Sequence, residues 1–263
     1  MCTIFKHELK SNLKSLIIWM TCVGGFGFFC IVLFSSVKES MAGMAESFAS
    51  MGAFADAFGM SQLSIATLAG FYAAEVGTIH ALGGAMFAAI MSTCMLSKEE
   101  DGHTSEFLYS LPLSRTSVIS AKLLAIIVNV FVFNVICVGV YLVGIAVLGE
   151  EMPMKEFFIY HIMQLVMQLE IAVVCFAVSA FMKKNKLGIG LGVVLLLYAY
   201  DLIARVVPDL SESKVMSPFA YANAADILST GEADITALVI GMTVILVSLV
   251  TAYIIYNKKD LVV

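Results

Sequence analysis

Six long stretches of this sequence carry almost no charge, and they constrain the fold more than any other feature. Four of them, residues 15–37, 76–97, 123–149 and 235–257, contain no Asp, Glu, Lys or Arg, and the other two contain only Glu170 and the pair Asp201 and Arg205. A helix needs roughly 20 consecutive apolar residues to cross the hydrocarbon core of a bilayer. The sequence therefore predicts an all-α membrane protein with six transmembrane helices. The predicted spans lie at about 15–37, 76–97, 118–148, 157–182, 187–207 and 235–257, in one domain covering residues 1–263.

The composition agrees with a chain that is dissolved in a bilayer. Of the 263 residues, 60% are hydrophobic and 13% are charged, whereas about a quarter of the residues of a soluble domain are charged. The basic residues form no clustered face of the kind that binds nucleic acid, so we expect no nucleic-acid partner. The six cysteines include no C-x-x-C pair and no His at ligand spacing, so we expect no metal site.

The distribution of lysine and arginine predicts how the chain is oriented. Six spans place both termini on one side, and eleven of the 15 basic residues fall on that side. Because basic loops stay in the cytoplasm, both termini are predicted to be cytoplasmic. Residues 4–16 alternate apolar and lysine side chains at helical spacing, which predicts an amphipathic helix at the inner membrane surface and in contact with membrane lipids.

The connection between the second and third spans shows the most distinctive pattern. Three consecutive acids, residues 99–101, are followed by Gly102, which breaks the helix. A short amphipathic helix is predicted over about 104–110, ending before Pro112, and Ser114 is a good N-cap for the next helix. A short helix with acids at its start is suited to docking on a soluble partner that has a basic, apolar-lined groove.

This connection resembles a recurring signature of ABC type-2 permeases. The family shows an acidic pair, a glycine, a threonine, an acid, Phe-Leu, then Leu-Pro-x-Ser-Arg and Lys-Leu-Leu at the start of the third span. The matching residues are Glu99-Glu100, Gly102, Thr104, Glu106, Phe107-Leu108, Leu111-Pro112-Leu113-Ser114-Arg115 and Lys122-Leu123-Leu124. His103 separates the glycine and threonine that are adjacent in many members. A weaker match is Ser217-Pro218-Phe219 before the last span.

The resemblance implies the permease subunit of an ABC exporter in the bacterial cytoplasmic membrane. Residues 99–115 would couple it to an ATP-binding subunit, present in two copies, beside a second permease copy or a sister permease. The implied coupling residues are Glu99, Glu100, Asp101, Gly102, Thr104, Glu106, Phe107, Leu108 and Arg115. The cargo expected from the resemblance is amphipathic: an antimicrobial peptide, a drug or a lipid-like molecule.

The sequence contains no nucleotide-binding or catalytic motif. There is no G-x-x-x-x-G-K-[ST] phosphate loop, no H-E-x-x-H and no G-x-S-x-G, and the four histidines are scattered. We therefore predict that the chain is not an enzyme on its own and binds no cofactor. ATP and Mg²⁺ are expected on the partner ATPase.

Two outer loops are candidate gates. Met and Phe residues between 41 and 58 repeat at steps of three and four, which predicts an amphipathic helix. It either contacts the cargo as a flexible gate or rests on the bundle as a cap. Residues 218–228 are predicted to form a helix that dips toward the membrane, as family members often show. The candidate gate residues are Phe48, Met51, Phe58, Pro218 and Phe219.

Polar residues inside two spans allow more than one interpretation. Gln164, Gln168 and Glu170 either line a transport path or a subunit contact, or are locally bonded side chains. Asp201 and Arg205 are four residues apart, which favours a structural ion pair on one helix face.

Two alternatives to an ABC permease remain open from the residues alone. The first is an ATP-independent secondary transporter with Glu170 as its proton or ion site, which predicts gradient-driven transport. The second is a membrane assembly or sensing subunit without a transport path, which predicts that substitutions at Glu170 leave its function intact.

Overall fold

The computed structural model describes residues 2–57, 59–110 and 112–259. Across these ranges the chain is helical, without strands, and six helices are long and apolar enough to cross a membrane. The predicted all-α class and number of spans are confirmed. The six helices cover Cys2–Ala49, Leu68–Thr93, Arg115–Leu148, Met154–Phe181, Leu187–Val206 and Ile235–Lys258.

Two of these spans combine more than one helical segment. The first is α1 (Cys2–Trp19) and α2 (Gly25–Ala49), joined by the π-helical turn Met20–Gly24, and the second is α4 (Leu68–Phe71) and α5 (Thr78–Thr93), joined by the π-helical turn Tyr72–Gly77. The remaining spans are α8 (Arg115–Leu148), α9 (Met154–Phe181), α10 (Leu187–Val206) and α12 (Ile235–Lys258). The connections contain α3 (Ala53–Ala57), α6 (Lys98–Asp101), α7 (Ser105–Ser110), the 3₁₀ segment Pro208–Met216 and α11 (Ala224–Thr230).

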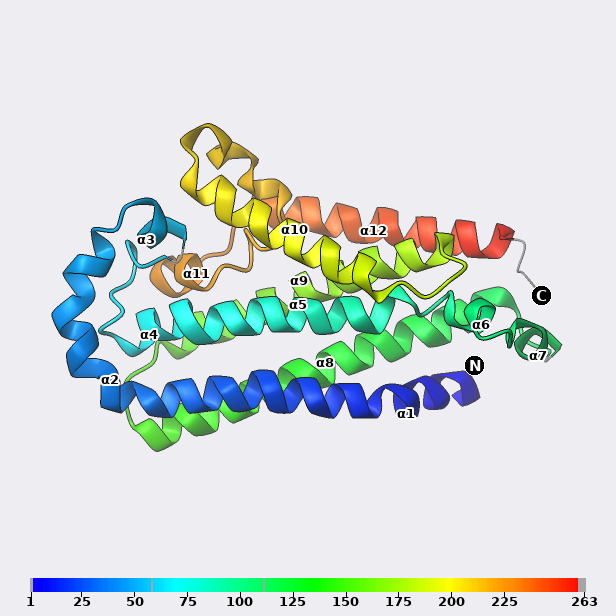
Figure 1. The fold of residues 1–263 in the computed structure, drawn as a ribbon, viewed down its shortest axis with the longest axis horizontal. Coiled ribbons are helices and arrows are strands. Elements are labelled where there is room, and N and C mark those ends of the chain that lie inside the picture. The colour runs from blue at the N-terminus through cyan, green and yellow to red at the C-terminus, as the bar shows by residue number, and fades with distance from the viewer. Residues whose placement is uncertain (1, 58, 111, 260–263) are drawn as a thin grey trace.

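The spans run side by side along the long axis of the molecule (Figure 1). Helix α9 packs against α5, α12 and α8, while α8 also packs against α1 and α2, and α10 packs against α5. The start of α1 and the end of α12 lie at the same end of the bundle as α6 and α7, on the right in Figure 1. We call this the proximal end, and the opposite end, which holds α3, α4 and α11, the distal end.

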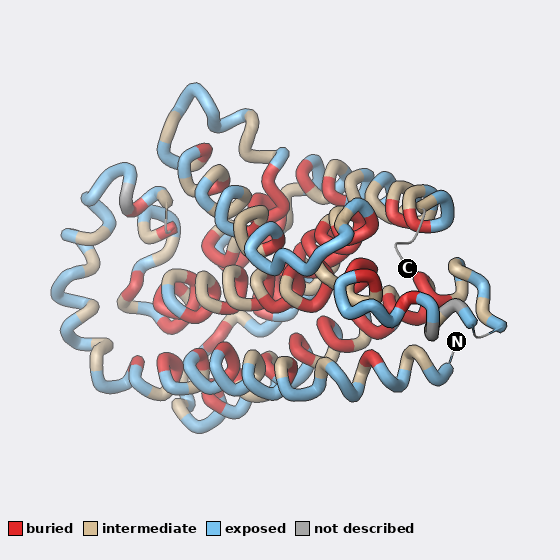
Figure 2. The backbone as a smooth tube through the Cα atoms, turned by 45° about the vertical axis from the view of Figure 1, so that its right-hand side comes forward, coloured by how far each residue is buried: buried red, intermediate tan, exposed pale blue. Residues whose placement is uncertain are grey.

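Burial is concentrated in the middle of the bundle. Most of the buried residues of the spans lie on α5, α8 and α9 (Figure 2). Helices α10 and α12 instead expose many large apolar side chains. Leu196 and Ile235, for example, are 73% exposed. Lipid tails are as apolar as leucine, so these faces are suited to contact with lipid or with another membrane subunit.

Local sequence signals set several helix boundaries. Ser114 caps α8 as predicted, because its hydroxyl accepts the N–H of Ser117 at 3.2 Å. Asn223 and Asp234 cap α11 and α12 in the same way. At the other end of α8, Gly149 has φ 71°, a left-handed conformation that glycine adopts without steric cost.

The first span differs from its predicted form. Residues 4–16 are helical as predicted, but they are not a separate helix, because the chain from Cys2 to Ala49 forms one continuous 48-residue helical span. Helix α1 packs along α8, and Glu8 and Leu16 are buried. The start of the predicted Met-rich helix is the far end of α2, and α3 follows as a separate turn of helix.

Two other boundaries also differ from expectation. The second span begins at Leu68 rather than near residue 76, because the Thr67 hydroxyl accepts the N–H of Gly70 at 3.1 Å and caps α4. In the 218–228 segment, only the part from Ala224 is helical, while residues 218–222 form turns. The segment is nonetheless largely buried inside the distal end, as a dipping connection requires.

Candidate functional site

The short helices α6 and α7 form a compact connection at the proximal end. Helix α6 ends at Gly102, and His103 takes a left-handed conformation with φ 52°. The backbone N–H of Thr104 donates to the carbonyl of Glu99 at 2.9 Å, which folds the chain back before α7 begins. This arrangement directs Glu99 and Glu100 toward the bundle.

Two of those acids form ion pairs with lysines of other helices. Glu99 Oε1 lies 2.5 Å from the Nζ of Lys122 on α8, and Glu100 Oε1 lies 2.7 Å from the Nζ of Lys259, which follows α12. Lys98 pairs with Glu8 of α1, whose other oxygen lies 4.0 Å from Lys122. We call this set the proximal ion cluster: Glu8, Lys98, Glu99, Glu100, Lys122 and Lys259.

The proximal ion cluster is largely buried and is reinforced by backbone carbonyls. The side chain of Lys122 is 0% exposed, and its Nζ also donates to the carbonyl of Met95 at 2.6 Å. Lys259 Nζ donates to the carbonyl of Met182 at 2.5 Å, at the end of α9. A buried charge is tolerated only when it is paired and hydrogen-bonded. The ion pairs and the hydrogen bonds to backbone carbonyls therefore both help to stabilise these lysines inside the bundle.

Arg115 fastens a further pair of helices at the same end. Its Nη1 donates to the backbone carbonyls of Tyr256 at 3.3 Å, Asn257 at 3.2 Å and Lys259 at 2.6 Å. The start of α8 is therefore tied to the end of α12. Together with the ion cluster, this links the connection to α1, α8, α9 and α12.

The candidate coupling residues divide into two groups. Glu99 and Glu100 turn inward, whereas Asp101, Gly102, Thr104 and Glu106 are exposed at the surface. Leu108 is partly buried, and the side chain of Phe107 lies outside the described part of the structure. The exposed group is the part that is accessible to a partner.

Sequence reasoning missed Glu8 and Lys259 as members of this site. Lys122 was noted only as part of the motif at the start of the third span. Glu8 is the only acid among the first 38 residues, surrounded by lysines. That isolation was the one feature of the sequence that set Glu8 apart. Nothing in the local pattern indicates that it pairs with lysines of α6 and α8.

The polar residues of α9 are buried and bonded. Gln164 Nε2 donates to the carbonyl of Ala222 at 2.7 Å, and Glu170 Oε2 accepts the hydroxyl of Tyr221 at 2.7 Å. Gln168 Oε1 accepts from the side-chain amide of Asn134 at 2.7 Å. Gln164 and Glu170 thus hold the 217–230 segment, and none of the three lines an open path in this conformation.

Glycines on the neighbouring helices make room for these side chains. A Cβ at Gly84 of α5 would overlap the amide of Gln168, and a Cβ at Gly241 of α12 would overlap the carboxyl of Glu170. Burial raises the pKa of Tyr221 well above its usual range, so the phenol keeps its proton and donates a hydrogen bond to Glu170.

A second buried polar cluster connects α5, α8 and α9. His161 Nε2 and the hydroxyl of Tyr72 lie 2.8 Å apart, and His80 lies 3.2 Å from both Tyr141 and Asn134. The rings of His80 and His161 are 5.0 Å apart. Two of the four histidines that are scattered in the sequence therefore lie in one cluster. Their separation along the chain gave no indication that they are neighbours.

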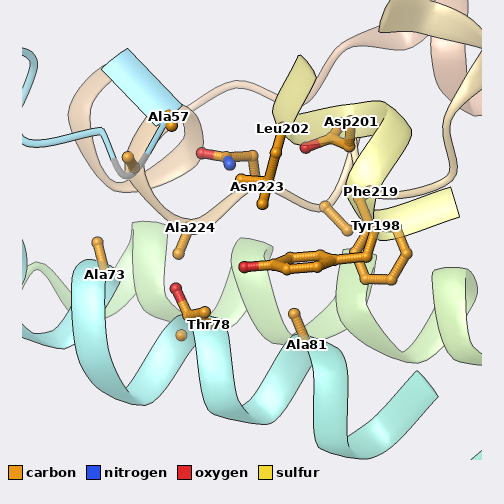
Figure 3. A pocket seen from close by; sticks show the side chains of 13 residues that line it. Ala57, Ala73, Thr78, Ala81, Tyr198, Asp201, Leu202, Phe219, Asn223 and Ala224 are labelled. Atoms are coloured by element: carbon orange, nitrogen blue, oxygen red, sulfur yellow. The ribbon is translucent and has the colours of Figure 1, made fainter. Parts of the chain in front are cut away.

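A small cavity lies at the distal end between α5, α10 and the 217–230 segment (Figure 3). Its volume is about 40 Å³, and alanines together with Tyr198, Thr78 and Asn223 surround it. A water molecule needs roughly 10–15 Å³ of such volume, so the cavity accepts a few waters and no cargo.

The distal end is also held by a charged bridge. Arg205 Nε donates to Asp201 Oδ2 at 2.7 Å, and its Nη1 donates to Asp226 Oδ2 at 3.0 Å. The structure thus brings together Asp201 and Arg205 and adds a residue of α11 that sequence reasoning had not included.

The candidate gate residues do not form one group. Pro218 and Phe219 are buried, and the ring of Phe219 lies 5.4 Å from that of Tyr198. Phe48 is partly buried near the end of α2, and Met51 is 52% exposed. Phe58 lies outside the described residues. The gating role stays a prediction.

Comparison with known proteins agrees with the sequence signature. A search of curated proteins gave no match. Residues 2–261 match the profile of the ABC-2 family transporter protein, which covers nearly the whole chain. This membrane protein with six candidate spans therefore belongs to the ABC-2 transporter family as a permease component that is not itself catalytic.

Proposed function

We propose that this chain is the transmembrane permease of an ATP-driven exporter that moves an amphipathic cargo outward. It works with two copies of a separate ATP-binding subunit, which hold ATP and Mg²⁺, and with a second permease copy or a sister permease. The observation that carries the proposal is the proximal ion cluster, because it joins the signature connection to three membrane-spanning helices.

The exposed side of the connection supplies the docking surface. Asp101 and Glu106 are exposed on α6 and α7, at the end of the bundle that sequence analysis assigns to the cytoplasm. Two acids beside a short helix complement a basic groove on a partner and favour fast, specific association. The bacterial cytoplasmic membrane is the proposed location.

The buried side of the connection transmits the movement. When the ATPase subunits close, they displace α6 and α7. The pairs Glu99–Lys122 and Glu100–Lys259 then pass that displacement to α8 and to the end of α12, while Glu8–Lys98 passes it to α1. Since buried ion pairs are costly to break, the connection and these helices move together.

Charge reversal on the docking surface tests the proposal. The chain is co-purified in nanodiscs with the ATPase encoded beside it, as wild type and as Asp101→Arg/Glu106→Arg. We expect a loss of co-purified ATPase of about tenfold or more, because like charges across an interface are repulsive. The matched control, Asp209→Arg/Glu212→Arg, reverses two exposed acids outside this connection and should bind normally.

A second variant separates docking from transmission. Glu99→Gln removes the charge that pairs with Lys122 and leaves the exposed acids unchanged. We expect normal ATPase binding with reduced transport per ATP hydrolysed. Normal binding by both the charge-reversal variant and its control would show that the ATPase docks elsewhere on the chain.

The secondary-transporter alternative has weaker structural support. Glu170 is buried, accepts a hydrogen bond from Tyr221 and packs on Gly241, so it holds the fold together where the alternative needs an accessible ion site. Export by reconstituted chain without any ATPase would favour that alternative.

A further inference from the structure

The outward face of α1 carries three exposed lysines in a row. Lys6, Lys10 and Lys14 are four residues apart, and we call them the lysine row. At 3.6 residues per turn they lie within an arc of about 80°, roughly opposite the buried Glu8. Helix α1 lies at the edge of the bundle, where it packs against α8 and α5 (Figure 1). The lysine row therefore faces away from the rest of the protein.

The lysine row has no counter-charge in the protein. None of its members forms a salt bridge within the part of the chain that the structure describes. Glu8, the only acid nearby in the sequence, pairs with Lys98 on the opposite side of α1. Two like-charge pairs, Lys6 with Lys10 and Lys10 with Lys14, are each one turn apart, and such pairs destabilise a helix. An anion from outside the chain would stabilise this arrangement.

The lysine row lies at the level of the membrane surface. Residues 15–37 contain no charged side chain, and at 1.5 Å per residue they extend about 34 Å, close to the ~30 Å thickness of the hydrocarbon core. Lys14 is therefore at the edge of the hydrocarbon, and Lys10 and Lys6 follow about 6 and 12 Å beyond it. Lysine side chains extend along a helix to place their charge at the interface. The charge of an anionic membrane surface acts over ~8–10 Å, so it reaches the row.

Two apolar side chains extend the same face of α1 toward the middle of the bilayer. Leu13 and Ile17 are each 49% exposed and lie on the same side of the helix as the lysine row. A phospholipid has the matching layout, with a phosphate at the surface and acyl chains beneath it. An acidic protein or a free anion would leave these apolar side chains uncovered, so the observations favour a lipid.

We propose that the lysine row and its apolar neighbours bind anionic phospholipids, with headgroup phosphates paired to Lys10 and Lys14 and an acyl chain along Ile17. In the predicted orientation these lipids belong to the inner leaflet. Each lysine near an anionic surface strengthens binding about fivefold. The opposite face of α1 contributes Glu8 to the proximal ion cluster, so the lipid holds a helix to which the coupling connection is tied. That the lipid thereby affects transport rests on the proposed function, whereas its binding is a property of this chain alone.

The test uses the chain alone, in detergent micelles that contain equal amounts of phosphatidylglycerol and phosphatidylcholine with identical acyl chains. Native mass spectrometry counts the molecules of each lipid that the protein retains. We expect the wild-type chain to retain phosphatidylglycerol preferentially. Lys6→Gln/Lys10→Gln/Lys14→Gln should lower that preference about tenfold or more. Lys6→Arg/Lys10→Arg/Lys14→Arg preserves the charges and should preserve the preference.

The matched control removes the same number of charges at the same end of the bundle. Lys183, Lys184 and Lys186 are exposed in the loop between α9 and α10 and do not form a row on one helix face. Lys183→Gln/Lys184→Gln/Lys186→Gln should therefore keep the preference for phosphatidylglycerol. The thermal unfolding midpoints of both glutamine variants in phosphatidylcholine micelles verify that each remains folded.

Two results would overturn the inference. An unchanged preference in the α1 glutamine variant would show that the lysine row is not the lipid site, and if that variant also failed to co-purify with the ATPase, the row would dock a protein. Equal losses in the two glutamine variants would show that overall charge, and not this row, selects the lipid. Because the lipid measurement contains no ATPase, neither result decides the proposed coupling function, and failure of coupling leaves the lipid measurement standing.

Discussion

Lys122 and Glu99 form a buried ion pair, with Nζ and Oε1 2.5 Å apart, between a membrane-spanning helix and the connection that carries the family signature. The acids of that connection therefore have two different roles. Glu99 and Glu100 hold the connection to the bundle, and Asp101 and Glu106 face outward.

Replacing Lys122 with methionine should destabilise the chain strongly. The substitution leaves Glu99 without its buried cation and removes the 4.0 Å contact of Glu8, which keeps Lys98, and loss of one partner of a buried pair costs about 3–5 kcal/mol. The thermal unfolding midpoint of the purified chain in detergent measures the change.

Lys38→Met provides the comparison for Lys122. Lys38 pairs with Glu150 at 2.6 Å, but the two side chains are 43% and 36% exposed, so its loss should change the free energy of unfolding by only about 0–1 kcal/mol. Equal shifts in the two variants would show that burial adds nothing to the Lys122 pair.

Gly241→Ala should displace Glu170 from its hydrogen bond with Tyr221. The new Cβ overlaps the Glu170 carboxyl, and overpacking of this kind costs about 1–3 kcal/mol. Gly192→Ala, where a Cβ meets nothing, should be neutral or slightly stabilising. If both variants unfold at the same temperature, close packing around Glu170 is not required.

Tyr221→Phe should weaken the attachment of the 217–230 segment and change the response to alkali. Removing the hydroxyl leaves the Glu170 carboxyl unpaired, at a cost of about 1–3 kcal/mol. Because folding raises the pKa of Tyr221, its proton contributes stability below the unfolded value of about 10, and that contribution is lost as the pH rises above it. Unfolding midpoints between pH 8 and 11 should therefore fall less steeply in the variant, and parallel curves would contradict this assignment.

The two acids that Arg205 bridges should differ in their importance. The side chain of Asp201 is 4% exposed and that of Asp226 is 28% exposed. We expect Asp201→Asn to lower the unfolding midpoint clearly more than Asp226→Asn, since desolvation strengthens a charge pair. Added salt should reduce the effect of Asp226→Asn further, and a larger effect at Asp226 would reverse the assignment.

The sequence predicted the helices better than it predicted their partners. Six spans follow from apolar runs of sufficient length, and the cap at Ser114 follows from local chemistry that needs no tertiary contact. The continuous first span was missed because lysines at residues 6, 10 and 14 resemble an interfacial helix. In the structure Glu8 of this helix is buried against α6 and α8, a contact that the local pattern does not show.

The candidate site required long-range information for the same reason. Three acids beside a glycine predicted a docking surface for a partner. Which of these acids faces inward, however, depends on Lys122 and Lys259 of other parts of the chain. His80 and His161 lie on different spans, so their proximity follows from the packing of α5 on α9. Sequence spacing along one helix contains no such information.

The glycines beside Gln168 and Glu170 have a mechanical consequence. Each leaves just enough space for one polar side chain of α9, so turning α5 or α12 about its own axis would replace that space with a side chain and create a collision. The register between these helices is therefore fixed. We expect α5, α9 and α12 to travel as one rigid block when the molecule changes conformation.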